Sequence, residues 1–299
     1  MFETIIPENE QHWLDLRTKV LTSTDMAALF GISPYCTPYE LWWRKKDNVV
    51  IDFKGNERTE WGLFLQDGIA AKFAKDNGWN IRRMNEFIMD KDIRVGSSFD
   101  FSIDEDGILE VKNVGFQSIQ KDWLFDGDNI EAPAFIELQV QVQLFVSNRK
   151  YAYIGALQDG NKGILIRREP SPKIHDAIKQ KCAAFWESID KDQSPAPNFE
   201  TDSKFIATLY NSSEPGKVVS VAEDEGIVAM VEEYKALGNA IKTAETGREE
   251  IKAKVLMAIG DAEKAFGGAF TISAGMVGPA DIAYRREGYR MFKINFKKG

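Results

Sequence analysis

Apolar residues recur at helical spacing in several stretches of the chain. Between residues 58 and 77, the large apolar residues Trp61, Leu65, Ile69 and Phe73 fall four positions apart, which predicts a helix that Gly78 ends. The same criterion predicts two helices within 12–47 and an amphipathic helix over 172–189. The second of the early helices begins at Ser23 or Thr24 and ends before Gly31.

A strand pattern replaces the helical one after Gly78. Three β-segments are predicted over 79–90, 93–104 and 107–113, and an acidic turn joins the last two. A hairpin is predicted from 151–157 and 163–169. Residues 134–147 support two interpretations, because they alternate like a strand but also place Phe135, Leu138, Val142 and Phe145 on one helix face.

The order of these elements indicates a mixed α/β fold with a C-terminal extension. Prolines and charges without apolar periodicity mark 191–203 as a linker between a domain over 1–190 and an extension over 204–299. Within the extension, helical patterning over 221–265 weakens near Gly238 and Gly247, which predicts helices near 221–237 and 240–259 that pack as a hairpin. Short β-like pieces follow over 268–298.

Composition narrows the class of protein. The chain has 299 residues, of which 43% are hydrophobic and 28% charged, as in soluble globular proteins. No apolar run reaches the roughly 18–20 residues that span a bilayer, and the first residues lack the pattern of a secretory signal. Two cysteines, Cys36 and Cys182, and two histidines disfavour thiolate zinc, iron–sulfur and histidine-rich metal sites. We expect a cytoplasmic protein.

The net charge of −8 argues against a protein that simply coats nucleic acid, because neutralisation of phosphates dominates such binding. An enzyme that holds divalent cations is less affected, since part of its acidic charge serves the metal.

Candidate chemistry lies at the predicted hairpin of 93–113. Alternate side chains of a strand share a face, so Glu110 and Lys112 point the same way, and Asp100 on the preceding strand lies beside Glu110. Two neighbouring carboxylates repel each other unless a cation lies between them, and hard oxygen ligands suit Mg²⁺ or Mn²⁺. The arrangement favours metal-assisted phosphodiester hydrolysis, with Lys112 orienting water or balancing phosphate charge. The same three residues also arise by chance in hairpins with solvated charges.

Four ordered blocks raise the weight of this pattern. They are Trp13-x-x-x-Arg17 with 20–35, Gly62–Gln66, Ser98-Phe99-Asp100 with Glu110-Val111-Lys112, and Gln139-Val140-Gln141. In this order, residues 13–189 resemble the lambda exonuclease/YqaJ-like viral recombinase family of the PD-(D/E)xK nuclease superfamily. The resemblance implies a restriction-endonuclease-like core, in which helices flank a central mixed sheet.

The resemblance also implies residue roles. Asp100, Glu110, the carbonyl of Val111 and Gln66 match the metal site, where Gln66 stands in place of the family's glutamate. Gln139 joins Asp100, Glu110 and Lys112 as a catalytic residue. Arg17, Thr24 and Gln141 match positions that bind DNA, with Arg17 and Thr24 at the 5′-terminal phosphate. For Gln141, a polar residue on a half-buried element is an equally good interpretation; for Arg17, the alternative is a surface salt bridge.

The function implied is an Mg²⁺- or Mn²⁺-dependent exonuclease that resects duplex DNA 5′→3′ from its ends for phage-type single-strand annealing. Its expected partners are double-stranded DNA ends, further copies in a ring-like homo-oligomer and a single-strand annealing protein, without a membrane. The expected setting is the cytoplasm of a bacterial host of a phage or prophage. Alternatives are a weakened or inactive DNA-binding or assembly protein on the same fold, and an endonuclease of the superfamily.

Overall fold

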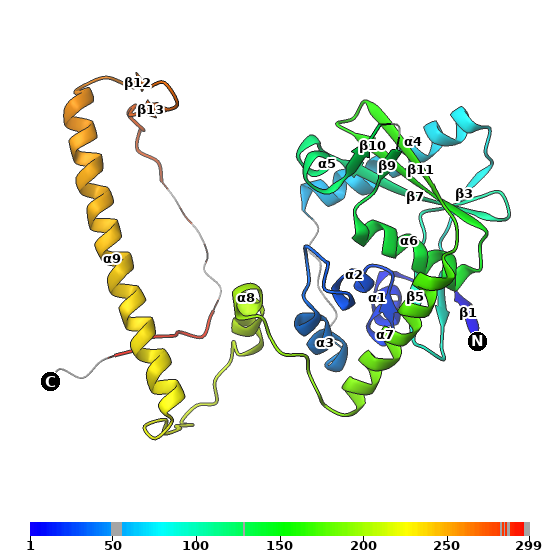
Figure 1. Cartoon of the computed structure of the whole chain (residues 1–299), viewed down its shortest axis with the longest axis horizontal. Helices are drawn as coiled ribbons and strands as arrows, with labels where there is room; N and C mark the ends of the chain where they lie inside the picture. The colour runs from blue at the N-terminus through cyan, green and yellow to red at the C-terminus, as the bar shows by residue number, and fades with distance from the viewer. Residues whose placement is uncertain (49–55, 128, 282, 284, 286–287, 296–299) are drawn as a thin grey trace. The chain divides into compact units, whose positions relative to one another are not determined.

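The computed structural model describes residues 1–48, 56–127, 129–281, 283, 285 and 288–295 (Figure 1). Within it the chain forms two compact units, Met1–Phe205 and Ile206–Gly299.

The first unit is built on a five-stranded sheet with the strand order β11-β10-β7-β6-β3. The central strands β7 and β10 run parallel, and the other neighbours pair antiparallel. The sheet is therefore mixed, and the predicted mixed α/β fold is confirmed. The strands are β3 (Ile81–Arg83), β6 (Phe101–Ile103), β7 (Gly107–Val114), β10 (Tyr151–Gln158) and β11 (Lys162–Arg168).

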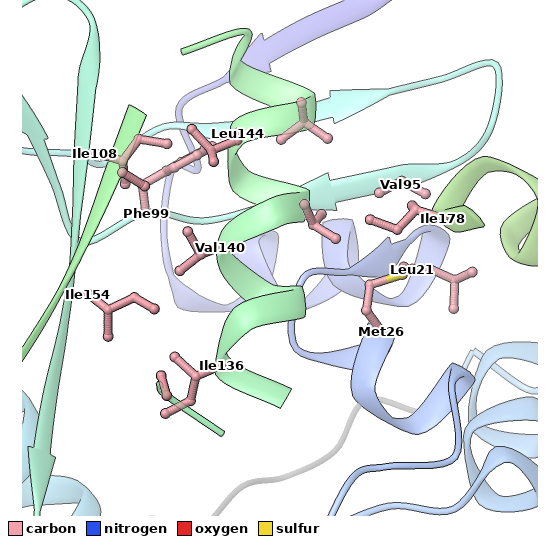
Figure 2. Packing of buried hydrophobic residues seen from close by; sticks show 14 of the residues in the cluster. Leu21, Met26, Val95, Phe99, Ile108, Ile136, Val140, Leu144, Ile154 and Ile178 are labelled. Atoms are coloured by element: carbon pink, nitrogen blue, oxygen red, sulfur yellow. The ribbon is translucent and has the colours of Figure 1, made fainter. Parts of the chain in front are cut away.

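Helices cover both faces of this sheet. On one face, Leu109 and Val111 of β7 pack with Ile69 of α4 (Glu57–Asn77). On the other face, Ile108 and its neighbours contact α6 (Ala134–Ser147), whose Ile136, Val140 and Leu144 point toward Ile108 and Ile154 (Figure 2). Since side chains alternate along β7, Glu110 and Lys112 lie on the face that α6 covers.

A second, four-stranded sheet has the order β1-β4-β5-β2, and α6 also contacts it. Leu21, Met26, Val95 and Ile178 fill the side of α6 away from β7 and β10 (Figure 2). The chain passes from β5 in this sheet to β6 in the other through Ser98-Phe99-Asp100, which places Asp100 where the two sheets meet. The elements here are β1 (Phe2–Ile5), β2 (Leu21–Thr22), β4 (Phe87–Asp90), β5 (Val95–Ser97), α1 (Glu10–Lys19), α2 (Asp25–Leu29), α3 (Pro38–Lys46) and α7 (Pro172–Asp190).

Several predicted elements are confirmed, and others are corrected. The helices predicted over 58–77 and 172–189 correspond to α4 and α7, and the hairpin predicted from 151–169 is β10–β11. Residues 134–147 form a helix, which ends at Asn148 in the left-handed conformation with φ 52°. The segments predicted over 79–90 and 93–104 each break into two strands that belong to different sheets.

The remaining elements of the first unit are α5 (Phe116–Asp122) and a small hairpin of β8 (Leu124–Asp126) and β9 (Asn129–Glu131). Helix α8 (Phe199–Leu209) begins inside the segment predicted as a linker over 191–203. Its Asp202 is 1% exposed and accepts hydrogen bonds from the hydroxyl of Thr37, at 2.5 Å, and from the backbone N–H of Asn198, at 2.7 Å. The end of that segment therefore packs on α3 and is not a free connection.

The second unit contains one long helix, α9 (Glu225–Ile259), followed by a hairpin of β12 (Lys264–Phe266) and β13 (Thr271–Ser273). The prediction of two helices packed as a hairpin is wrong. A glycine inside a helix costs about 1 kcal/mol relative to alanine. This cost does not break α9 at Gly238 or Gly247, and the helix continues through both residues. Within the described residues, no helix combines the length and apolar character that crossing a membrane requires.

Candidate active site

The β6–β7 pairing brings the two predicted carboxylates together. Phe101 lies opposite Leu109 in the antiparallel register, so Asp100, directly before β6, comes beside Glu110. The Oδ2 of Asp100 accepts a hydrogen bond of 2.8 Å from the backbone N–H of Val111. Asp100 is thereby fixed against the strand that carries Glu110 and Lys112, as the alternation of residues predicted.

Glu110 is held by three donors. Its side chain is 3% exposed, and its Oε1 lies 2.5 Å from the Nζ of Lys112 and 2.6 Å from the Nε2 of Gln139. Its Oε2 accepts from the Nε2 of Gln143 at 2.7 Å. Charge-assisted hydrogen bonds of this kind fix the plane of a carboxylate. The side chain therefore keeps one orientation toward the position of Asp100.

Asp100 has no comparable compensation. Burial raises its pKa to about 7, and the negative charge of Glu110 acts in the same direction, against the smaller effects of Lys112, the Val111 N–H and Gln66. Burial would lower the pKa of Lys112, but Glu110 and Asp100 outweigh it and the pKa is raised. Lys112 therefore stays charged while the site retains excess negative charge, which a divalent cation would neutralise.

The oxygen atoms here fit a hard divalent cation. Asp100 and Glu110 supply carboxylates, and the amide of Gln66 hydrogen-bonds to Asp100, although its Oε1 already accepts from Arg83 at 3.2 Å. The N–H and C=O of a strand residue point to the same side, so the bond from Val111 N–H to Asp100 directs the Val111 carbonyl toward that carboxylate. Among the described residues no three His, Cys, Asp or Glu side chains form a metal-binding group. The donor set is thus two acids supplemented by neutral oxygens, as suits Mg²⁺ that keeps several waters.

The three glutamines of α6 have different surroundings. Gln139 lies in the site, where its Oε1 also accepts from Lys112 at 3.1 Å. Gln141 does not: its Nε2 donates to the carbonyl of Glu169 at 2.9 Å and its Oε1 accepts from the N–H of Ser171 at 3.0 Å. Gln141 is buried and holds the loop before α7, which fits the alternative interpretation of a polar residue on a half-buried element; its contact with DNA stays a prediction.

Sequence reasoning missed Gln143. It is fully buried, donates to Glu110 and, at 3.2 Å, to the carbonyl of Ser98, and its Oε1 has no partner among the described residues. Residues four apart share a helix face, so Gln139 and Gln143 point to the sheet together, while Gln141 points elsewhere. If residues 134–147 are assigned as a helix, the four-residue spacing from Gln139 predicts that Gln143 also faces the site.

Arg17 and Thr24 also come together, as predicted. The Nη2 of Arg17 donates to the hydroxyl of Thr24 at 3.2 Å, and its guanidinium lies 4.6 Å from the centre of the Trp13 ring. Burial lowers the pKa of Arg17, against the opposite effect of Asp25. Asp25 itself pairs with Lys45 at 2.7 Å, so this acid is already neutralised by another residue.

One short segment connects Arg17 and Thr24 to the carboxylates. The indole N–H of Trp13 donates to the hydroxyl of Ser98 at 2.8 Å, and the hydroxyl of Ser97 donates to that of Ser23 at 2.8 Å. Ser97 and Ser98 lie two to three positions before Asp100 in the chain. Their hydrogen bonds therefore fix α1 and the start of α2 close to the carboxylates.

Comparisons with known proteins agree with this arrangement. Residues 12–150 match the model of the YqaJ-like viral recombinase domain. The chain is 24% identical over 264 residues to uncharacterized protein YqaJ of Bacillus subtilis, covering 86% of this chain and 81% of that protein.

Among solved structures, an alkaline exonuclease from Laribacter hongkongensis is 16% identical with a TM-score of 0.49, over 67% of this chain and 99% of that one. A phage related exonuclease from Haemophilus somnus is 12% identical with a TM-score of 0.42, over 57% and 94%. The match to the family model covers the motif blocks from Trp13 to Gln141 that indicated the resemblance. Residues 12–150 are therefore similar to the YqaJ-like viral recombinase domain family.

Proposed function

We propose that this protein is a Mg²⁺- or Mn²⁺-dependent exonuclease that hydrolyses phosphodiester bonds of duplex DNA, starting at an end and proceeding 5′→3′. The observation that carries the proposal is the pair of carboxylates of half-buried Asp100 and buried Glu110, with Lys112 beside them. The match of residues 12–150 to the YqaJ-like viral recombinase domain supports it.

The roles follow from the contacts. Asp100, Glu110, the Val111 carbonyl and the Gln66 amide would hold the cation, which when bound supplies Lewis-acid stabilisation of charge on the phosphate. Lys112 stays charged between Glu110 and the substrate and balances the phosphate. Gln139 contacts both Lys112 and Glu110, so it keeps the amine and the carboxylate in one arrangement.

The pair of Arg17 and Thr24 supports a preference for a 5′-phosphorylated end. Its guanidinium donates to a hydroxyl and not to a carboxylate, because Asp25 is engaged by Lys45. A guanidinium and a threonine hydroxyl at the start of a helix can both donate to a terminal phosphate. Cleavage would then begin close to that phosphate.

Labelled duplex DNA tests the reaction. Linear duplexes labelled at either the 5′ or the 3′ end, and a covalently closed circle, are incubated with Mg²⁺ or Mn²⁺. The proposal predicts nucleotide release from 5′ ends, no cleavage of the circle and loss of release in Asp100→Asn. Glu105→Gln, on the exposed turn of the same hairpin, is the matched control and should keep activity. Cleavage of the circle would indicate an endonuclease instead.

The phosphate role has its own test. Arg17→Gln should reduce the preference for a 5′-phosphate over a 5′-hydroxyl end by about tenfold, the effect of one charge-assisted contact. Arg167→Gln, an exposed arginine paired with Glu169, is the control. An unchanged preference in Arg17→Gln would exclude Arg17 and Thr24 as the binding site of the 5′-phosphate.

Gln66 favours a second candidate function, a DNA-binding or assembly protein of weak or absent activity. Its neutral amide replaces an acid of the family, and Arg83 already donates to its oxygen. Under this alternative the wild-type protein binds duplex ends without releasing nucleotides, and Gln66→Glu gains activity. Under the first proposal the wild type is active, and Gln66→Glu lowers the Mg²⁺ concentration that gives half-maximal rate.

The resemblance also supports a ring-like homo-oligomer around DNA, a single-strand annealing protein as partner, and a phage or prophage setting in the bacterial cytoplasm. Mixing the protein with a candidate annealing protein in light-scattering experiments would test the partner.

A further inference from the structure

Helix α9 of the second unit presents a stripe of apolar residues that one arginine, Arg248, interrupts. The helix has 35 residues and none of them is buried. Leu237, Ile241 and Ile251 are 57%, 60% and 62% exposed. The stripe runs at alternating intervals of three and four residues, the heptad pattern of helices that wrap around each other. Its members are Ile227, Met230, Tyr234, Leu237, Ile241, Ala244, Arg248, Ile251, Val255 and Ala258.

Little of the described part of the second unit covers this stripe. The ring of Phe292 lies 5.7 Å from that of Tyr234, yet Tyr234 remains 56% exposed. The middle of the helix is lined by small residues beside the stripe, and a side-chain carbon added at Gly238 or Gly247 would meet nothing within 4 Å. Two helix-weakening glycines that no neighbour in the chain requires are consistent with close approach of another helix.

We propose that α9 pairs antiparallel with α9 of a second copy of this chain. With the two helices fully overlapped, each large stripe residue of one helix lies opposite a smaller or complementary one of the other. Ile241 faces Ala244 of the second copy, and Tyr234 faces Ile251. The two copies are related by a two-fold axis near residues 242 and 243, so every contact occurs twice.

Charge favours the antiparallel orientation. In a parallel pair, Arg248 of one copy would face Arg248 of the other, and like charges in a core position oppose pairing. In the antiparallel pair Arg248 faces Leu237, over which its apolar stem can lie while the guanidinium reaches water. The antiparallel register also places Glu233, on the flank of the stripe, opposite Lys254 of the second copy.

Glu233 and Lys254 are available for that contact. Neither takes part in the ion pairs among the described residues of α9, which join Glu232 to Lys235 and Glu249 to Lys252. Those two ion pairs lie outside the apolar stripe. Glu233 and Lys254 therefore have no ion-pair partner among the described residues.

Light scattering of the full chain after size exclusion tests the pairing, independently of nuclease activity. Leu237→Glu places a charge in the stripe and should halve the molar mass of the assembly. Asn239→Glu, on the opposite face of the same helix, should leave the mass unchanged. Circular dichroism checks that both variants keep the helix. Equal masses for the wild type and Leu237→Glu would overturn the proposal.

A charge exchange tests the orientation. Glu233→Lys and Lys254→Glu alone should each weaken self-association roughly threefold to tenfold, as like charges across a helix pair do. The double variant Glu233→Lys/Lys254→Glu should restore it. In a parallel pair the two positions lie about 30 Å apart along the axis, so the double variant would not recover. Failure to recover would contradict the antiparallel arrangement.

Discussion

Two aspartates of the first unit show opposite electrostatic settings. Burial would raise the pKa of Asp25, but Lys45 at 2.7 Å, Arg17 and the N–H of Thr22 outweigh it and the pKa falls below its ordinary value. At Asp100 burial and Glu110 act together, and the pKa rises to about 7. One carboxylate has a cation from its own chain, whereas the other faces a second carboxylate.

The difference indicates that Asp25 stabilises the fold, whereas Asp100 is the acid proposed to bind a cation. Asp25 accepts from the N–H of Thr22 and pairs with Lys45, which also donates to the carbonyls of Arg17 and Val20. These bonds fix the backbone around Arg17 and Thr24 without an external ion. At Asp100 and Glu110 the chain supplies one amine, that of Lys112, for two carboxylates, and under the proposed function a divalent cation supplies the remaining positive charge. We therefore expect substitutions at the two places to affect different measurements.

Removal of the amine at the proposed metal site should have the largest effect. Lys112→Met leaves Glu110 and Asp100 without their neighbouring positive charge, and the cleavage rate should fall by about 10²–10⁴-fold. Single-turnover rates at saturating Mg²⁺ measure this. Lys150→Met, an exposed lysine paired with Asp106, is the control. A rate within threefold of wild type in Lys112→Met would remove Lys112 from the catalytic residues.

At the structural acid, stability should change instead. Asp25→Asn breaks a partly buried ion pair, in which the side chains of Lys45 and Asp25 are 8% and 22% exposed. The expected loss is about 2–3 kcal/mol, or about 5–10 °C in Tm for a unit of this size. Differential scanning calorimetry measures it. Asp76→Asn, which breaks a pair on the surface of α4, should shift Tm by less than about 2 °C; equal shifts would contradict the contrast.

Two glutamines of one helix sharpen the comparison further. Gln143→Leu removes the donor to Glu110 and Ser98 and should raise the Mg²⁺ concentration for half-maximal rate by about 10–100-fold, since residues that orient ligands act on metal affinity. Gln141→Leu breaks bonds to the loop before α7 and should lower Tm without changing the Mg²⁺ requirement. The reverse outcome would exclude Gln143 as a positioning residue.

The smallest expected effect is a dependence of stability on pH. Because the pKa of Asp100 is raised in the folded state, the metal-free protein loses stability as pH rises from about 4 through about 7. Asp100→Asn removes that loss and should raise Tm at pH 8 by about 2–8 °C, with little change at pH 4. Mg²⁺ should stabilise the wild type more at pH 8 than at pH 6. Equal Tm values for the two proteins at pH 8 would contradict a strained carboxylate pair.

Local patterns predicted the part of the site that lies within one hairpin. Asp100, Glu110 and Lys112 come together because strand alternation and hairpin register are properties of a short stretch. Gln143 was missed because residues 138–144 alternate like a strand, and only packing between two sheets selects the helix. Periodicity does not report that choice.

The same limit explains the errors in the fold. The breaks at 84–86 and 98–100 depend on which sheet each strand joins, which is a long-range property. The sequence pattern predicted helix ends near Gly238 and Gly247 because glycine is common at helix ends, but α9 is continuous across both residues.

Isothermal titration of metal-free protein with Mn²⁺ tests the central claim most directly, because it measures binding without requiring catalysis. The account predicts binding to the wild type that Asp100→Asn abolishes or weakens at least tenfold, while Asp25→Asn, as far as it remains folded, binds as the wild type does. Equal affinity of the wild type and Asp100→Asn for Mn²⁺ would show that the two carboxylates do not hold a cation.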